Sequence, residues 1–289
     1  MKVVLTGARG FIGSRLLEAF RAAGHSVTAV VRVPAHAPLG AVVGDLRTVD
    51  LRPHVDGADF VVHAATVTAG VAGDLWSGNV LAAQRVTAAA VVAGARLLYL
   101  STTGVYGKSF GQFGDPSLMR RRPSSPLSTA RAAAEDVVLA AGGTVIRPHV
   151  VHGPGDRWVV PPLAKFMLEH NAWLGGADVA VAAITARRLA EGVTALLGRP
   201  HLPAALHASE PRSTFVADLV APFFRTADRV LPSRVLTIDD ALARLGPGGA
   251  SRNALSMLGR ASGMDSDAFW GTPASARARF ACMESGNAR

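Results

Sequence analysis

A glycine-rich turn between a strand and a helix constrains the fold of this chain more than any other feature. Residues 2–5 form a short apolar run, and Thr6-Gly7-Ala8-Arg9-Gly10-Phe11-Ile12-Gly13 follows at once. Residues 14–23 then carry apolar side chains at helical spacing and end before Gly24, and a second apolar run covers 27–31. This order of strand, turn, helix and strand predicts a dinucleotide-binding unit in an α/β fold with a doubly wound parallel sheet.

The glycines of this turn have separate physical tasks. Residues without a Cβ atom let the backbone turn tightly, approach a pyrophosphate and bring the helix close to the sheet. The first amides of the helix then face the phosphates with the positive end of the helix dipole. The expected cofactor contacts here are Gly7, Arg9, Gly10, Phe11, Ile12 and Gly13. The alternative is a tight structural turn that holds no ligand.

The pattern Thr-Gly-x-x-Gly-x-x-Gly resembles the N-terminal motif of the extended short-chain dehydrogenase/reductase family. That family includes nucleotide-sugar epimerases, dehydratases and many ketoreductases. The resemblance covers about residues 1–210 and fades in the last eighty. It implies a nucleotide-binding Rossmann domain formed by 1–155 and 177–209, with a smaller C-terminal substrate lobe formed by 156–176 and 210–289.

Composition narrows the class of protein further. Of 289 residues, 49% are hydrophobic, yet no apolar run is long and charge-free enough to cross a bilayer. The first strand begins at residue 2, so we expect no signal peptide and a cytoplasmic protein without a membrane partner. The single Cys282 rules out an internal disulfide framework, and the sequence contains no metal-ligand cluster.

The net charge of +9 raises the question of a nucleic-acid partner. The arginines are scattered over the chain, and the tightest run, Arg120-Arg121-Arg122, lies among Pro and Ser residues without interleaved aromatic side chains. We therefore expect no nucleic-acid partner. The charge would instead favour solubility and attract an anionic cofactor or substrate.

The end of the second strand indicates which dinucleotide binds. An NAD site usually has an Asp or Glu at this point to hold the ribose hydroxyls, but no acid lies between Glu18 and Asp45. The strand ends in Arg32, whose guanidinium suits the extra 2′-phosphate of NADP(H), and Arg9 could close over the same phosphate. The sequence therefore predicts NADP(H), the alternative being two solvated arginines.

The family resemblance implies further cofactor contacts, each just past the carboxyl end of an expected strand. They are Asp45 and Leu46 against the adenine, Ala64 and Ala65 against the ribose, and Pro148 and Val150, whose backbone would meet the nicotinamide carboxamide. His63, at the end of the strand before Ala64, is expected to be a packed residue rather than a catalyst.

A hydroxyl-rich block follows the strand 97–100. The sequence Ser101-Thr102-Thr103-Gly104-Val105-Tyr106-Gly107 resembles the family's Ser-Ser/Thr-x-x-Val-Tyr-Gly element. In that family the hydroxyl three residues before the Val binds the substrate carbonyl, which implies Thr102 here. Ser101 or Thr103 could share the role. The alternative is that these hydroxyls only end a strand.

The family's catalytic pair is missing from this chain. Relatives carry Tyr-x-x-x-Lys on one helical face, where the ammonium lowers the pKa of the phenol. In the helix that begins at Pro126, Leu127 occupies the tyrosine position and Arg131 the lysine position. No Tyr-x-x-x-Lys occurs elsewhere in the sequence. Epimerase and dehydratase activities, which use that tyrosine to remove a substrate proton, are therefore disfavoured.

Hydride delivery to a ketone remains chemically feasible. Arg131 could position the nicotinamide ribose, and a substrate phenol hydrogen-bonded to the ketone could supply the proton. This pattern resembles the atypical ketoreductases of angucyclinone antibiotic pathways. The candidate substrate contacts are Thr103, Tyr106, Leu127, His149, His152 and Trp158. Tyr106 is also a candidate acid, whereas His149 and His152 are more often structural than catalytic in such places.

Apolar spacing predicts the remaining elements. They are helices over 126–135, 187–196, 214–224, 238–245, 253–260, 265–270 and 274–283, an alanine-rich helix opened by Asn79, and strands over 179–183 and 206–208. We expect 179–183 to return to the main sheet and 206–208 to be its last strand.

The sequence thus predicts an NADPH-dependent ketoreductase, a monomer or homodimer, that acts on a polycyclic aromatic polyketide ketone. The other hypothesis is a non-catalytic NADP-binding sensor or interaction protein that has lost its catalyst.

Overall fold

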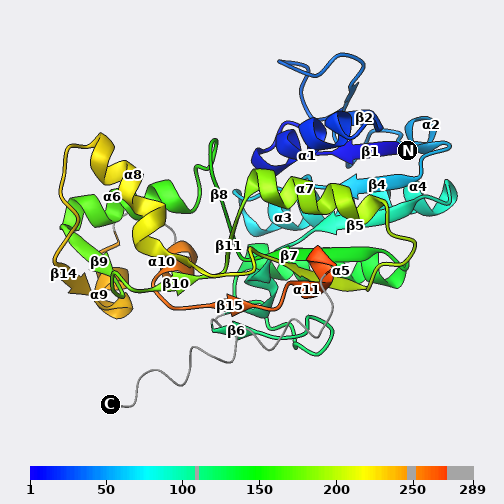
Figure 1. The fold of residues 1–289 in the computed structure, drawn as a ribbon. Coiled ribbons are helices and arrows are strands. Elements are labelled where there is room, and N and C mark those ends of the chain that lie inside the picture. The colour runs from blue at the N-terminus through cyan, green and yellow to red at the C-terminus, as the bar shows by residue number, and fades with distance from the viewer. Residues whose placement is uncertain (108–110, 246–251, 272–289) are drawn as a thin grey trace.

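A seven-stranded parallel sheet forms the larger part of the protein (Figure 1). The structure is a computed structural model that describes residues 1–107, 111–245 and 252–271. The sheet order is β12-β7-β5-β4-β1-β2-β3, which confirms the predicted doubly wound α/β fold. Its strands are β1 (Lys2–Thr6), β2 (Ser26–Val31), β3 (Val42–Val43), β4 (Phe60–His63), β5 (Arg96–Leu100), β7 (Thr144–Pro148) and β12 (Ala205–Ala208).

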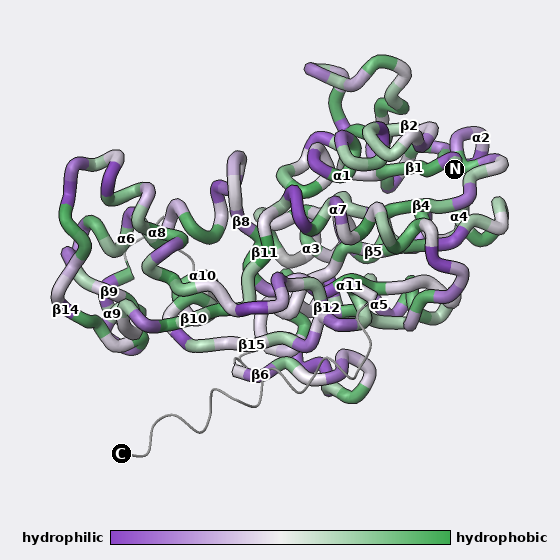
Figure 2. The backbone as a smooth tube through the Cα atoms, viewed as in Figure 1, coloured by the Kyte–Doolittle hydropathy of each residue, from purple (hydrophilic) through white to green (hydrophobic). Residues whose placement is uncertain are grey.

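Helices cover both faces of this sheet. On one face lie α1 (Phe11–Ala22) and α7 (Ala186–Leu197), and on the other lie α2 (Arg52–Val55), α4 (Ala82–Val92) and α5 (Pro126–Ala140). Alternate side chains of β1 point to opposite faces of the sheet. Val3 and Leu5 join the core under α1, whereas Val4 joins the core under α4. The central strands β4 and β5 are accordingly apolar over Phe60–Val62 and Leu97–Leu100 (Figure 2), because both of their faces are buried.

The strand order reverses at β1, which has β2 on one side and β4 on the other. In open α/β sheets a ligand binds outside the carboxyl ends of the strands at such a switch point. The glycine turn follows β1, and residues 64–67 follow β4 at the same edge. The fold therefore places the predicted cofactor segments side by side.

A smaller lobe lies beyond the carboxyl edge of the sheet, on the left in Figure 1. Its own apolar core includes Leu163, Trp173, Val220 and Leu258. The lobe is built from α6 (Val160–His170), β9 (Ala172–Leu174), β10 (Ala180–Val181), β13 (Thr214–Phe215), α8 (Val216–Thr226), β14 (Arg234–Leu236), α9 (Ile238–Ala243) and α10 (Arg252–Leu258). The helices expected over 187–196, 238–245 and 253–260 are confirmed to within two residues at each end.

One expected strand and the start of one expected helix differ from the structure. Residues 179–183 do not return to the main sheet: β10 pairs with β13, and β11 (Ala183–Thr185) pairs with β8 (Val150–His152). The position beside β7 is taken by β12, which forms that edge of the main sheet. The expected start of 214–224 is also a short strand, β13, before the helix begins.

The helical run around Asn79 also differs from expectation. It begins at α3 (Ala72–Trp76), passes through a π-helical turn at Ser77–Leu81 and continues as α4. Asn79 thus lies inside a π-turn instead of opening a helix. Such turns are frequent at functional sites.

The last described helix, α11 (Asp267–Trp270), packs on the sheet domain. Phe269 is fully buried in the core between α1, α7 and the sheet, where it contacts the backbone position of Gly192. This part of the segment 210–289 thus lies against the nucleotide-binding side. The remaining pieces are a 3₁₀ turn at Thr103–Tyr106, β6 (Gln112–Phe113) and β15 (Gly263–Met264). The expected helix over 274–283 lies outside the described residues.

Gly13→Ala should destabilise the protein by at least about 2 kcal/mol, because the new methyl group would overlap the Gly7 carbonyl oxygen. Urea denaturation of the wild type and the variant measures this. Gly73→Ala is the matched control, since its methyl group would meet open space on an exposed turn of α3. Equal stability of the Gly13 variant and the wild type would contradict the close approach.

Candidate functional site

The glycine turn lies directly against the chain that follows β4. Gly7 has a φ of 73°, and a Cβ atom on it would lie 2.6 Å from the Ala65 nitrogen. The Gly10 amide donates to the Gly7 carbonyl at 2.8 Å, which closes the turn. A side chain on Gly7 would therefore collide with the backbone of Ala64 and Ala65 and push the turn away from them.

The amino end of α1 is open. Gly10 is its N-cap residue and offers no side-chain acceptor to the first amides of the helix, those of Phe11, Ile12 and Gly13. An uncapped helix start behind a glycine turn is the arrangement that binds a pyrophosphate. The residues present thus fit a dinucleotide, which their backbone amides would hold.

Charged side chains follow β2 and β3. Asp45 accepts two hydrogen bonds from the Arg47 guanidinium at 2.9 and 2.6 Å, and this pairing lowers the pKa of Asp45 to about 2. Arg32 is exposed at the end of β2, has no hydrogen bond or ion pair within the described residues, and adds to the lowering of the Asp45 pKa. Leu46 is half-buried beside this pair.

Three hydroxyl residues follow β5 and have different surroundings. Thr102 is half-buried, and its hydroxyl accepts a hydrogen bond from the Gly104 amide at 3.2 Å. Ser101 is 4% exposed, and its hydroxyl has no partner within the part of the chain that the structure describes. Thr103 is buried and hydrogen-bonded to His149 Nδ1 at 2.7 Å. Of the three, Thr102 remains the one with access to solvent.

Arg131 lies on α5 one turn after Leu127, and both are half-buried. The helix begins with a capping box between Ser125 and Ser128, which fixes its first turn. Arg131 Nε donates to Thr66 Oγ1 at 3.3 Å, and Thr66 Oγ1 donates to Asn79 Oδ1 at 2.8 Å. Arg131 is thereby tied to the edge of the sheet that carries the glycine turn.

The amide of Asn79 holds the loop after β4 in place. It accepts from the Val67 amide at 3.2 Å and donates to the carbonyls of Val67 and Leu75 at 2.9 and 2.7 Å. All of these bonds lie in or beside the π-turn. The extra residue of that turn thus lets one buried amide bind both the loop and the helix.

His63 is packed, as expected for a strand-end residue. Its Nδ1 is hydrogen-bonded to Thr6 Oγ1 at 2.6 Å, and its ring stacks on Tyr99 at 5.3 Å. Burial, and secondarily the charge of Arg131, lower the pKa of His63 to about 4. Burial raises the pKa of Tyr99 to about 12, so neither ring is an acid at neutral pH.

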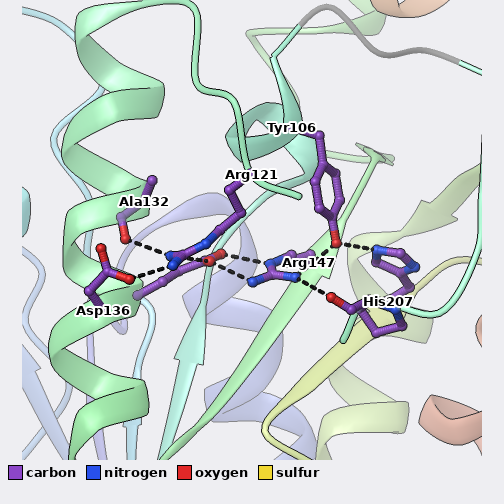
Figure 3. A network of polar contacts seen from close by, with 8 residues as sticks. Tyr106, Arg121, Ala132, Asp136, Arg147 and His207 are labelled. Carbon is purple, nitrogen blue, oxygen red and sulfur yellow. Dashed lines mark hydrogen bonds and ion pairs between the residues drawn. The ribbon is translucent and has the colours of Figure 1, made fainter. Parts of the chain in front are cut away.

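Tyr106 belongs to a buried polar network (Figure 3). Its hydroxyl is hydrogen-bonded to Arg147 at 2.8 Å and to His207 at 2.7 Å. Arg147 forms a two-point ion pair with Glu135 at 2.9 and 2.7 Å, and Arg121 reaches Glu135 at 3.2 Å and also pairs with Asp136. Burial raises the pKa of Tyr106.

The network corrects two of the expected substrate contacts. Tyr106 is 1% exposed, so its hydroxyl is occupied within the protein and is not available as an acid or a substrate ligand. His149 is also buried, hydrogen-bonded to Thr103 and packed 5.0 Å from the Phe113 ring. The hydrogen bond between Thr103 and His149 therefore links the segment after β5 to the segment after β7. Pro148 and Val150, on either side of His149, are buried too.

Aromatic side chains flank the glycine turn. Phe11, at the start of α1, lies 6.1 Å from the Trp158 ring, and Trp158 is 51% exposed. Asp156 accepts a hydrogen bond from the Trp158 amide at 2.8 Å, which fixes this loop. His152, at the end of β8, is half-buried, and burial lowers its pKa.

Sequence reasoning missed the residues that hold this site together. Thr66 and the Glu135–Arg147 pair were not among the candidates, although an Arg inside an apolar strand and a Glu four residues after Arg131 indicate a buried ion pair. Within the described ranges, no cluster of His, Cys, Asp or Glu could hold a metal ion. The same ranges contain no helix of the length and apolarity that a bilayer span requires.

The fold and the glycine cradle define a dinucleotide-binding Rossmann protein. Residues 3–188 match the NAD dependent epimerase/dehydratase family, and the chain belongs to that family. Over 97% of its length the fold is similar to MoeE5 in complex with UDP-glucuronic acid and NAD, with a TM-score of 0.67, 24% identity and all of that chain covered.

Two curated relatives are reductases by name. The chain is 30% identical over 211 residues to the 4-hydroxy-2-methyl-3-oxo-4-farnesyl-3,4-dihydroquinoline-1-oxide ketoreductase of Stigmatella aurantiaca, which covers 67% of this chain and 63% of the relative. It is 33% identical over 185 residues to the 2-alkyl-3-oxoalkanoate reductase of Stenotrophomonas maltophilia, which covers 57% and 55%. The chain therefore spans less than two thirds of the length of either relative.

The buried histidines predict a loss of stability in acid. Burial holds the pKa values of His63, His149 and His207 at about 4, below the ordinary 6.5. Between pH 4 and 6.5 the unfolded chain binds more protons than the folded protein does. The free energy of unfolding is therefore highest above pH 6.5 and falls as the pH drops toward 4. Each histidine contributes up to about 3 kcal/mol by this linkage.

Urea denaturation at pH 7.5, 6 and 5 measures this effect. His207→Gln should reduce the pH slope between 6.5 and 4, whereas the exposed control His201→Gln should leave it unchanged. A free energy of unfolding that is constant between pH 7.5 and 5 would contradict the burial of neutral imidazoles.

Proposed function

We propose that this protein is an NADPH-dependent ketoreductase without a catalytic tyrosine. One observation carries the proposal: an open glycine cradle lies at the sheet edge to which α5, the helix with Leu127 and Arg131, is tied through Arg131 and Thr66. By the family resemblance, Leu127 and Arg131 would stand at the positions of Tyr and Lys. Both tyrosines of the chain, Tyr99 and Tyr106, are buried. Family membership and the two reductase relatives support an NAD(P)-dependent oxidoreductase.

The cofactor proposed is NADP(H). The exposed guanidinium groups of Arg9 and Arg32 support it, because neither is paired within the described residues and no acid stands at the end of β2. The amides at the start of α1 would bind the pyrophosphate, and Arg131 would hold the nicotinamide ribose. When bound, the nicotinamide supplies the hydride that reduces the ketone.

The substrate proposed is a bulky ketone. More specifically, we propose a polycyclic aromatic polyketide of the simocyclinone-type angucyclinone class. The named relatives support a large apolar ketone, since one acts on a farnesylated quinoline oxide and the other on a 2-alkyl-3-oxoalkanoate. The Phe11–Trp158 pair beside the glycine turn would suit a flat apolar ring system.

The residues proposed for catalysis orient the carbonyl but supply no strong acid. The Thr102 hydroxyl would hydrogen-bond the ketone oxygen, with Ser101 directly before it at the end of β5. A positioned general acid contributes about 10²–10⁴-fold in rate. A phenol of the substrate, hydrogen-bonded to the ketone, would make up this contribution by giving its proton to the oxygen as the alkoxide forms.

Arg32→Asp should weaken NADPH binding by about a hundredfold and leave NADH binding nearly unchanged. The substitution removes a cation facing the 2′-phosphate and adds an acceptor for ribose hydroxyls. Fluorescence titration with both cofactors measures the two dissociation constants. Arg187→Asp on the exposed face of α7 is the charge-matched control. Equal losses for both cofactors in the Arg32 variant would refute the assignment.

The reaction is tested with a pair of matched ketones. One carries a phenol next to the carbonyl, and the other carries the methyl ether of the same phenol. We expect NADPH oxidation with the first and a rate at least about a hundredfold lower with the second. Full activity on the ether would remove the substrate-assisted step, and NADPH binding without turnover on any ketone would favour the non-catalytic sensor.

A further inference from the structure

The connection between α8 and β14 forms the outer edge of the smaller lobe, on the left in Figure 1 and away from the sheet domain. Val230 in this connection is 85% exposed, Leu231 is 47% exposed, and Val235 in β14 is 57% exposed. Figure 2 shows hydrophilic and hydrophobic stretches following one another along the same loop. Residues 225–235, here called the outer segment, thus present a group of aliphatic side chains to water, which is typical of an interaction surface.

Arginines stand among these aliphatic side chains. Arg225 lies in the last turn of α8, Arg229 comes directly before the exposed Val-Leu pair, and Arg234 begins β14. All of them are exposed, and their guanidinium groups form no ion pair or hydrogen bond within the described residues. The only acid in the segment is Asp228, so its positive charges outnumber its negative charge. The outer segment therefore combines an excess of positive charge with exposed apolar surface.

The backbone of the outer segment is fixed at both ends. The Arg229 amide donates to the Phe224 carbonyl at 3.0 Å. The Asp228 amide donates to the Arg225 carbonyl at 3.1 Å, and Asp228 has a left-handed φ of 50°. These two bonds form a Schellman motif, which ends α8. At the other end β14 pairs with β9, and Leu236 is buried in the core of the lobe. The exposed aliphatic side chains therefore belong to a segment that is held in place at the surface.

Aliphatic side chains flanked by arginines suit the surface of an anionic bilayer. Apolar side chains can enter the boundary between headgroups and acyl chains, while guanidinium groups pair with lipid phosphates. Each arginine close to an anionic leaflet adds to the attraction. A stable protein interface instead buries about 800 Å² on each partner and uses about 20–30 residues of each. The outer segment by itself is smaller than such an interface, which favours lipid over protein as the partner.

We propose that the outer segment docks the smaller lobe on a membrane surface that carries anionic lipids. Val230 and Leu231 enter the headgroup boundary, and the arginines of the segment contact lipid phosphates. The sequence predicts no membrane partner because it lacks an apolar run that could span a bilayer, but a contact at the surface needs no such run. Lipid docking goes beyond the proposed reduction and does not depend on it.

Co-sedimentation of the full chain with lipid vesicles tests the docking. We expect the wild type to bind vesicles of equal parts phosphatidylglycerol and phosphatidylcholine at least about tenfold more tightly than vesicles of phosphatidylcholine alone. The double variant Val230→Ser, Leu231→Ser should bind the anionic vesicles at least about fivefold more weakly, because the inserted apolar groups are lost. Arg229→Gln should weaken the same binding about three- to fivefold.

Two control variants carry the same kinds of change on other surfaces. Val91→Ser with Val92→Ser alters an exposed aliphatic pair at the end of α4, and Arg187→Gln removes an exposed arginine of α7. Both controls should bind the anionic vesicles within about twofold of the wild type, because their sites lie away from the docked surface. Thermal unfolding of each variant shows that any loss of binding comes from the surface and not from the fold.

Three results would overturn the docking. The first is a wild type that binds neither kind of vesicle. The second is anionic binding that the outer-segment variants and the controls retain or lose equally, since the net charge of the whole chain would then explain it. The third is a loss in the arginine variant but not in the serine double variant. Binding would then involve charge without insertion, and an acidic protein surface would be the better partner.

Discussion

The close approach of the glycine turn to the start of α1 is the constraint on which the rest of the site depends. Gly13 lies where any side chain would overlap the Gly7 carbonyl, and Gly7 lies against the backbone of Ala65. These contacts bring the uncapped helix start to the carboxyl edge of β1 and β4. The edge is therefore shaped for a bound phosphate before any ligand arrives, and the ordering cost of binding is small.

The other side of the site depends on a buried ion pair. Glu135 is fully buried, and Arg147 binds it at two points while also reaching Tyr106. Desolvating two charges offsets much of their attraction, so the pair contributes more to geometry than to net stability. Its geometric effect is specific, because it fixes α5 to β7 and so holds Leu127 and Arg131 at the same edge as Thr102.

Much of the fold could be predicted from the sequence, because it depends on local patterns. These are the glycine spacing, the continuous apolar runs of the strands and the start of α5 at Ser125 and Pro126. The pairing of 179–183 could not be predicted, because it depends on β12 having already taken the free edge of β7. The burial of Tyr106 and His149 was hidden for the same kind of reason. Their partners, Arg147, His207 and Thr103, are brought together only by long-range packing.

Helix α5 carries Leu127 in its first turn and Arg131 one turn later. A leucine on the first turn of α5 cannot donate a proton, so in the proposed reduction Thr102 and the substrate itself would stabilise the oxygen of the ketone. In the same proposal Arg131, whose Nε donates to Thr66 Oγ1, would order the ribose. Neither Leu127 nor Arg131 offers a base for proton abstraction from carbon, which is why a reduction is proposed.

The most direct test introduces a tyrosine at position 127 and measures the rate of ketone reduction. In single-turnover reduction of a ketone whose neighbouring phenol is methylated, Leu127→Tyr should react at least about tenfold faster than the wild type. Leu127→Phe, which adds the same ring without the hydroxyl, should not. If the phenylalanine variant matches the tyrosine variant, or the wild type already reduces the ether as fast as the free phenol, the central claim of a reductase without its own acid is contradicted.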